Sequence, residues 1–183
     1  MVERIALVTS GLLAWTFLEY LIHGWLSHAF KTFAMLLHAV HHRDPNAVFT
    51  IGAWIPLAAL WLVSIFGLGL TDGVLFFTGT LAGFIGYEAI HYRLHFCHPR
   101  SRLEIYLRTR HLIHHEYSPA GCFGVTSAFW DLVFGTEPTG AEITKLHESL
   151  ASRPPISGRT NVYKLKDFVL GRGLATKNAS RVA

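Results

Sequence analysis

Residues 51–70 form a run of twenty residues without one charged side chain, and this run limits the folds open to the chain more than any other feature. A helix of that length is about 30 Å long, which matches the hydrocarbon core of a bilayer. A turn signal, Thr71-Asp72-Gly73, follows the run, and Val74 to Ile90 then carries Glu88 as its only charge. The sequence therefore predicts a transmembrane hairpin over residues 51–90.

The N-terminal run from Ile5 to Ile22 is also apolar and about long enough to cross a bilayer. A secretory signal peptide is the alternative interpretation, but the run lacks a small-residue cleavage site and leads directly into His23 and His28. We therefore expect a retained helix. Trp25 to Asn46 has helix-like apolar spacing and stops at Asp44-Pro45, which predicts a helix at the membrane surface.

The composition agrees with a lipid environment, because hydrophobic residues make up 51% of the chain and charged residues only 15%. The net charge of +4 arises from basic residues that flank apolar runs, which favours a membrane surface rather than nucleic acid as the partner. Cys97 and Cys122 are too few for a disulfide framework and are expected to be core residues. The predicted fold class is an all-α integral membrane protein with about three transmembrane helices.

In this topology every histidine cluster lies on one side of the membrane, together with most of the basic residues near the spans. These basic residues are Lys31, Arg43, Arg93, Arg100, Arg102, Arg108 and Arg110. On the other side the hairpin tip carries only Asp72, and Arg4 is the only basic side chain near the N-terminus. The positive-inside rule makes the histidine side cytoplasmic. We therefore expect a cytoplasmic helical cap and, with three spans, an N-terminus on the outer side.

The C-terminal part of the chain has a different character. Residues 118–140 are rich in Gly, Pro, Ser and Thr and predict an ordered loop packed on the helices. Residues 141–152 predict a short helix, and residues 153–183 form a basic tail with seven Lys/Arg against one acid. The predicted division is a membrane domain over residues 1–140 and a C-terminal helix with its tail over residues 141–183.

Ten of the twelve histidines fall in four short groups, two of which share the spacing H-x-x-H-H. The four groups are His23 and His28; His38, His41 and His42; His91 and His95; and His111, His114 and His115. Residues three and four apart share a helix face, so each group gathers its imidazoles. So many imidazoles beside a membrane cost desolvation energy unless something accepts their lone pairs, and a metal ion does this while each ring stays neutral.

The number of histidines suggests how they are shared. Two tetrahedral zinc ions would leave two of the ten unused, whereas two octahedral ions would take five each and keep one open position apiece. Imidazole suits iron, copper, nickel and zinc, so zinc can replace iron in overproduced protein. Open positions on two neighbouring redox metals are what activation of dioxygen requires. His147 lies apart from the four groups and is interpreted as a surface histidine.

The ordered motifs resemble a known superfamily. They are E-Y-x-x-H-x-x-x-x-H from Glu19, H-x-x-H-H from His38, H-Y-x-x-H from His91, H-x-x-H-H from His111, and the segment Gly124 to Thr136. This pattern is similar to the fatty acid hydroxylase/sterol desaturase superfamily, and most similar to fatty acid 2-hydroxylases. The match covers about residues 15–136. In one departure, those enzymes tend to have His-His where this chain has His95-Phe96, so a compensating role for His98 stays open.

The resemblance implies a membrane-bound, non-haem di-iron enzyme that hydroxylates a lipid, most simply a fatty acid or fatty-acyl lipid. It implies two iron ions held by the ten histidines, with residues 1–140 as the hydroxylase domain. The chemistry would use dioxygen and two electrons. The chain shows no fused cytochrome domain, so we expect a separate electron-transfer protein as the donor. No catalytic residue beyond the metal ligands is expected.

Two carboxylates are predicted to support the ligands. Glu19 lies four residues before His23, and Glu88 lies three before His91, so either could accept the outer N–H of its histidine. The alternative is that they pair with Arg93 or Arg43 at the membrane interface. Asp131 and Glu116 rank after them as candidates.

Other functions are compatible with parts of the pattern. The same chemistry could act on a sterol, a carotenoid or a long-chain alcohol, as a hydroxylase or a desaturase, because the motifs do not determine the substrate. A non-enzymatic metal-binding or metal-transport membrane protein is an alternative of another class. Transport predicts polar residues inside the spans, and residues 51–70 have no ionisable one. A haem protein would need only two to four of the ten histidines.

Overall fold

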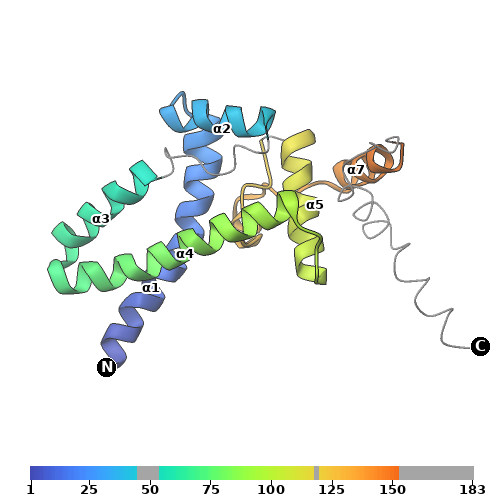
Figure 1. The fold of residues 1–183 in the computed structure, drawn as a ribbon. Helices are drawn as coiled ribbons and strands as arrows, with labels where there is room; N and C mark the ends of the chain where they lie inside the picture. Colours follow the sequence, from blue (N-terminus) through green and yellow to red (C-terminus); the bar gives the residue numbers. More distant parts are fainter. Residues whose placement is uncertain (45–53, 118–119, 153–183) are drawn as a thin grey trace, which may run out of the picture.

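The computed structural model of the chain describes residues 1–44, 54–117 and 120–152, which are helical and contain no β-strand within these ranges (Figure 1). The elements are α1 (Val2–Tyr20), η1 (Leu21–Ala29), α2 (Phe33–Arg43), α3 (Trp54–Leu68), α4 (Leu70–Phe96), α5 (Arg102–Glu116), α6 (Phe129–Phe134) and α7 (Gly140–Ser152). The all-α prediction is confirmed. The basic tail after residue 152 lies outside the described residues.

Two helices in the described residues are long and apolar enough to cross a membrane. The first combines α1 with the π-helical turns of η1 over Val2–Ala29, and the second is α4, with 27 residues. The predicted span over residues 51–70 is described from Trp54, and α3 has 15 residues, or about 22 Å. Residues 51–53 lie outside the described residues. The third span therefore stays a prediction.

α1 and α4 pack in parallel through glycines that let their backbones approach closely. A Cβ atom at Gly11 would lie 1.9 Å from the Phe76 carbonyl oxygen, and one at Gly79 would lie 1.9 Å from that of Val8. Small residues at the contact are the usual means of helix packing in membranes. Where the two helices first meet, Gly11 lies against Phe76 and Val8 against Gly79. Further along both helices, Trp15 lies against Gly83, so α1 and α4 run in the same direction. Their histidine-bearing C-terminal ends consequently lie together.

α3 and α4 form the predicted hairpin, but the turn is not at Thr71-Asp72-Gly73, which lies inside α4. The chain turns at Gly69, whose φ of 83° is in a region that favours glycine. Gly73 instead serves the packing of the hairpin, since a Cβ there would lie 2.5 Å from the Ser64 carbonyl oxygen. The turn signal was therefore correct in kind and wrong in position by a few residues.

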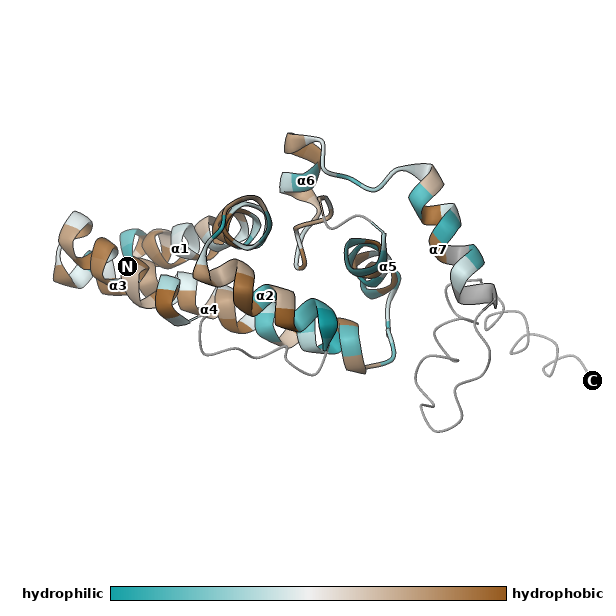
Figure 2. Cartoon of the chain, turned by 90° about the horizontal axis from the view of Figure 1, so that it is seen from above, coloured by the Kyte–Doolittle hydropathy of each residue, from teal (hydrophilic) through white to brown (hydrophobic). Residues whose placement is uncertain are grey.

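The polar part of the molecule is formed by α2 and α5. α2 lies across the C-terminal end of the α1–η1 helix, and α5 stands beside the end of α4 (Figure 1). In Figure 2, α5 is largely hydrophilic, whereas α1, α3 and α4 are largely hydrophobic. Ser101 caps α5 by accepting from the Glu104 amide at 3.1 Å. The hydrophilic and hydrophobic helices thus meet where the histidines lie.

The segment after α5 is an ordered loop as predicted, except that it contains the short helix α6. The predicted helix at residues 141–152 is present as α7. Leu146 of α7 packs with Ile113 of α5 and Cys122 of the loop in one buried cluster. The division of the chain at residue 140 stays a prediction, and α7 packs directly on the preceding part.

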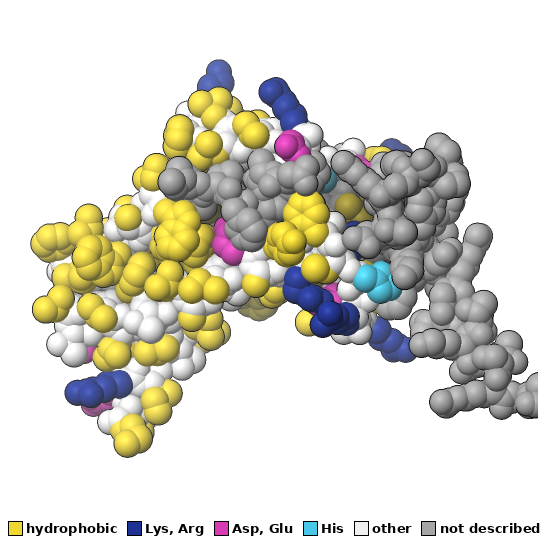
Figure 3. Space-filling model, viewed as in Figure 1, with side chains coloured by type: hydrophobic (Ala, Val, Ile, Leu, Met, Phe, Trp, Pro, Cys, Tyr) yellow, Lys and Arg dark blue, Asp and Glu magenta, His cyan; other side chains and the backbone are white. Residues whose placement is uncertain are grey.

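Hydrophobic side chains cover much of the surface around α1 and α3 (Figure 3). Val63 and Phe66 of α3 and Leu13 of α1 have exposed fractions of 66%, 86% and 64%. In water so large an apolar surface would be unfavourable, whereas in lipid it is the expected outer face. The helices therefore have the surface of a membrane protein.

Candidate metal centre

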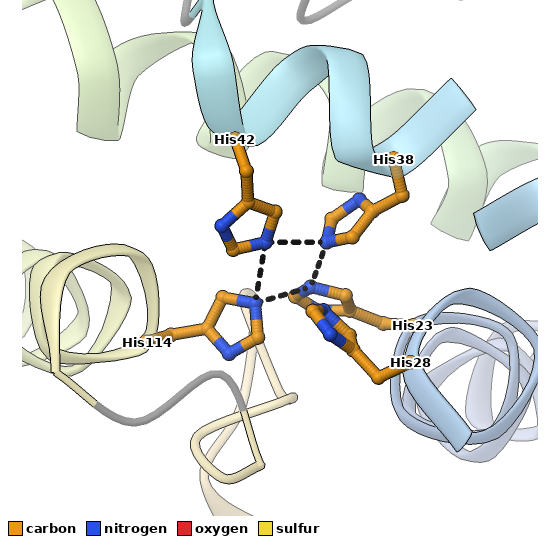
Figure 4. A group of neighbouring side chains, drawn as sticks. All are labelled: His23, His28, His38, His42 and His114. Carbon is orange, nitrogen blue, oxygen red and sulfur yellow. Dashed lines mark hydrogen bonds between the residues drawn. The ribbon is translucent and has the colours of Figure 1, made fainter. Parts of the chain in front are cut away.

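The structure brings all ten predicted histidines together in two groups of five. The first group is His23, His28, His38, His42 and His114, and the second group is His41, His91, His95, His111 and His115. Within each group one ring nitrogen from every histidine lies within 4.8 Å of the others. Figure 4 shows the first group, in which rings from η1, α2 and α5 converge. His98 lies outside both groups.

Each H-x-x-H-H motif serves both groups. In α2, His38 and His42 belong to the first group, whereas His41 belongs to the second. In α5 the assignment is reversed, because His111 and His115 belong to the second group and His114 to the first. Residues four apart point the same way on a helix, while the residue between them points further around its face. The two motifs therefore tie the groups together.

Four nitrogens of the first group form a closed quadrilateral (Figure 4). The Nε2···Nε2 distances are 3.1 Å for His23–His38, 2.8 Å for His38–His42, 3.1 Å for His42–His114 and 3.0 Å for His114–His23. The centre of a square with sides of this length lies about 2.1 Å from each corner, which is the usual length of a metal–imidazole bond. His28 is the fifth ring, beside His23.

The protonation of these rings shows what can lie between them. The Nδ1 atoms of His23 and His114 lie 2.6 Å from the Phe123 carbonyl oxygen and 2.7 Å from that of Gly121, so each Nδ1 donates its hydrogen. The Nε2 atoms then carry lone pairs. Burial lowers the pKa of His38 and holds that of His114 well below its ordinary value, so both rings stay neutral. The repulsion between the Nε2 lone pairs that face one another is therefore not relieved by added protons. The donor set fits a metal cation.

The second group is arranged around His95. Its Nε2 atom lies 2.7 Å from Nε2 of His111, 3.2 Å from that of His41 and 3.3 Å from that of His91. Burial lowers the pKa of His41 to about 4 and that of His111 well below its ordinary value. The Nδ1 atoms of His41, His91 and His111 are buried and have no hydrogen-bond partner in the described ranges. This group also fits a cation, but its outer nitrogens are not held as those of the first group are.

Glu19 does not support His23 in the predicted way. Its buried carboxylate accepts from the amides of Val125 at 2.6 Å and Thr126 at 2.8 Å and from the Thr126 hydroxyl. The outer N–H of His23 goes to a backbone carbonyl, so the prediction for Glu19 is wrong. The sequence could not reveal this, because every residue has a carbonyl and spacing cannot show which one reaches the ring.

Glu88 is placed differently again. One of its oxygens is buried without a hydrogen-bond partner among the described residues, so the structure shows no bond from His91 to that atom. The alternative of a pair with Arg93 is not found, because Arg93 makes its ion pair with Glu104 at 2.7 Å. A supporting role for Glu88 at His91 stays a prediction.

Two hollows reach the first group at His28. One has a volume of about 600 Å³ and is lined mainly by apolar side chains of η1, α6 and the loop, among them Phe123 and Phe134. The other has a volume of about 360 Å³ and is lined by α2 and η1, with His38, His42 and Arg43 in its wall. A ligand can therefore approach the first group from an apolar side and from a more polar side.

The comparison with known proteins agrees with this arrangement. The sequence profile of the family described as fatty acid hydroxylase matches residues 8–136, which include all ten histidines. The chain belongs to the fatty acid hydroxylase family. Within the matched residues, the structure does not describe 45–53 and 118–119.

Several characterised members of the fatty acid hydroxylase family are similar to the chain. A dihydroceramide fatty acyl 2-hydroxylase of Arabidopsis thaliana is 32% identical over 75% of this chain and 62% of its own length. A fatty acid 2-hydroxylase of Mus musculus is 33% identical over 72% of this chain and 39% of its own. The chain thus spans about three fifths of the plant relative.

A solved structure gives the same fold. The hydroxylase domain of scs7p superposes with a TM-score of 0.68 at 30% identity, covering 75% of this chain and 57% of that one. About three quarters of the chain therefore shares its fold with that hydroxylase domain.

Proposed function

We propose that the chain is a membrane-bound, non-haem di-iron oxygenase that hydroxylates a fatty acid or a fatty-acyl lipid. The observation that carries this proposal is the division of ten buried or half-buried imidazoles into two groups of five, each of which would leave one position of an octahedral ion open. The names of the similar family members support an acyl substrate and the 2-position. A separate protein would supply the two electrons, as the sequence suggests.

Iron bound to the two groups would activate dioxygen for insertion into an unactivated C–H bond. The histidines would hold it as neutral ligands, since burial keeps those of α2 and α5 unprotonated. The carbonyls of Gly121 and Phe123 orient two of the rings. The buried positions of His111 and His114, 2% and 0% exposed, keep bulk water away from the reaction.

The substrate would enter from the lipid phase. The apolar hollow of about 600 Å³ leads to His28 between η1 and α6, and its volume is in the range of ligand pockets. The smaller hollow has Arg43 in its wall, so a polar or anionic end of the lipid can lie on that side. In this arrangement the reacting carbon lies next to the first group, close to the polar end.

The membrane arrangement follows from the direction of the helices. α1 and α4 run in parallel, so if both cross the bilayer the chain must return between them, and α3 is the helix that runs back. We therefore propose three crossings, with the histidine side in the cytoplasm because the basic residues gather there. The outer end of α1 would then carry the N-terminus.

The test is to supply the detergent-solubilised chain with iron, a reductase system and lipid extracts under labelled dioxygen, and to analyse the lipids by mass spectrometry. We expect one labelled oxygen atom in an acyl chain, and none in the variant with His111, His114 and His115 all changed to Ala. If the label appears instead in a sterol, a carotenoid or a long-chain alcohol, that lipid is the substrate rather than an acyl lipid. Tightly bound zinc with no oxygen reactivity after iron loading would favour a non-enzymatic metal protein instead.

A further inference from the structure

The loop between α5 and α6 is held by a buried carboxylate that touches none of the histidines. Asp131 is 0% exposed and accepts four hydrogen bonds. Its Oδ1 accepts from the Phe123 amide at 2.8 Å and the Thr136 hydroxyl at 2.6 Å, and its Oδ2 accepts from the Gly124 amide at 2.8 Å and Arg110 at 2.6 Å. A carboxylate with this many donors fixes the backbone that surrounds it.

The backbone held in this way carries the two carbonyls that orient the first group. Gly121 and Phe123 accept from His114 and His23, and only Cys122 separates them. Cys122 has a φ of 57°, which a non-glycine residue adopts only when its surroundings impose it. The Asp131 bond to the Phe123 amide lies directly after this residue, and the Cys122 amide is held by the Thr136 carbonyl oxygen at 2.8 Å.

The fit around Asp131 leaves the loop little freedom. A Cβ atom at Gly124 would lie 1.9 Å from the Ser127 carbonyl oxygen and 2.8 Å from Oδ2 of Asp131. Arg110, 1% exposed, neutralises the carboxylate and also pairs with Glu137, which makes no hydrogen bond to residues 121–124 in the described part of the chain. Glu137 therefore shares the charge partner of Asp131 but not its contact with the loop.

We propose that Asp131 is a positioning residue that sets how tightly the first group holds its ion, by fixing the loop carbonyls that orient His23 and His114. The effect should be confined to the first group, because in the described part of the chain the ring nitrogens of the second group contact one another and not this loop. The inference rests on the proposed metal site, but it does not depend on which reaction that site performs.

The test measures how fast a chelator removes Co²⁺ from the full-length chain in detergent, together with the visible absorption bands of the bound Co²⁺. Removing a group that orients a metal ligand typically weakens binding about 10-fold to 100-fold. In Asp131→Asn we expect one of two ions to leave at least about 10-fold faster, with changed absorption bands for that ion, while the other ion behaves as in the wild type.

Glu137→Gln is the matched control, because it also removes an acid from Arg110 but leaves the loop bonds in place. It should release both ions at wild-type rates. If Asp131→Asn does not fold by circular dichroism, Thr136→Val removes one bond to Asp131 without changing a charge and should show a smaller effect on the same ion.

Equal release of both ions in the Asp131 and Thr136 variants, or the same loss in Glu137→Gln, would overturn the inference. A wild-type chain that binds two Co²⁺ and shows the selective loss in Asp131→Asn, but makes no hydroxylated lipid with iron, would support this inference and overturn the proposed function. A wild-type chain that binds no Co²⁺ or iron would overturn both.

Discussion

In the first histidine group two rings donate to carbonyls of one loop, whereas in the second group three rings keep a buried Nδ1 atom without a hydrogen-bond partner in the described chain. Both groups have five imidazoles, so the chemical identity of the ligands does not distinguish them. What differs is the support around them. A hydrogen bond to the outer nitrogen fixes a ring and raises its basicity, so the same donor set should hold its ion more firmly in the first group.

The groups also differ in access. The two hollows described above are both lined by histidines of the first group, His28 in both and also His38 and His42 in the smaller one. The second group lies where α2, α4 and α5 meet, and His91 and His111 are 3% and 2% exposed. Among the described residues the first group is therefore the one that these hollows reach.

The largest expected effect tests the grouping itself. A double variant within one group, His41→Ala with His111→Ala, should weaken one ion and leave the other bound. A double variant across the groups, His41→Ala with His114→Ala, should weaken both. Hydroxylation should fall at least about 100-fold in each, the upper range for loss of a residue that only orients a ligand. Titration with Co²⁺ gives the number of ions.

His98→Ala is the control for these variants, because this histidine lies outside both groups. It should bind two ions with wild-type affinity. If the pair His41 and His111 weakens both ions, as the pair His41 and His114 does, the grouping is wrong and each motif serves its own ion.

The second prediction concerns the order in which the ions leave. With a chelator in excess, release from the wild-type chain should have two phases that differ by about 10-fold, because within the described residues only the first group has hydrogen bonds to backbone carbonyls at its outer nitrogens. The faster phase should disappear in His111→Ala and the slower in His114→Ala, as measured by the absorbance of bound Co²⁺. A fast phase that disappears in His114→Ala would reverse the comparison.

Much of this site could be predicted from the sequence, because histidine spacing is a local property. Residues 38, 41 and 42 share one helix face whatever the fold, so the motifs indicated all ten histidines that the structure brings together. The exchange of His41 and His114 between the groups could not be predicted. It depends on how α2 crosses α5, which is determined by packing between residues far apart in the chain.

The fold was predicted at the same level of detail. Apolar runs indicated α1, α3 and α4 because hydropathy is a property of the segment, but the turn lies at Gly69, whose positive φ suits glycine, and Gly73 lies inside α4 against Ser64. The role of the glycines at the α1–α4 contact depends on packing between distant segments, which the sequence does not show. The supporting bonds at His23 and His114 were missed because backbone carbonyls have no signature in the sequence.

The third prediction concerns a glycine at the α1–α4 contact, whose replacement should affect the two histidine groups alike. Gly79→Ala places a methyl group against the Val8 backbone and separates α1 from α4, at a cost of about 1–3 kcal/mol in the free energy of unfolding. η1, which continues α1, carries histidines of the first group and α4 carries histidines of the second group, so both release phases should accelerate together. Thermal unfolding and chelator release measure the two effects.

Gly86→Ala is the matched control in the same helix, since a Cβ atom there meets nothing within 4 Å. It should leave the unfolding temperature and both release phases unchanged or slightly raise the stability. A selective change of one phase in Gly79→Ala would show that the α1–α4 contact supports only one group.

The smallest effect is expected at Glu19. This prediction tests whether Glu19 acts by holding the loop through hydrogen bonds or through its negative charge. Both backbone bonds go to Oε1, from Val125 at 2.6 Å and Thr126 at 2.8 Å. In Glu19→Gln the amide oxygen can still accept both, and the amide nitrogen can donate to the Thr126 hydroxyl. We therefore expect Glu19→Gln to change the free energy of unfolding by less than about 0.5 kcal/mol.

Glu19→Ala, in contrast, leaves two buried amides without an acceptor and should lower the free energy of unfolding by about 1–3 kcal/mol. It should also accelerate only the slower release phase, because the loop that Glu19 holds continues into the carbonyl that orients His23. Thermal unfolding of both variants in the same detergent gives the contrast. If Glu19→Gln proves as damaging as Glu19→Ala, the negative charge itself matters, and Glu19 acts on the ion of the first group electrostatically rather than through the loop.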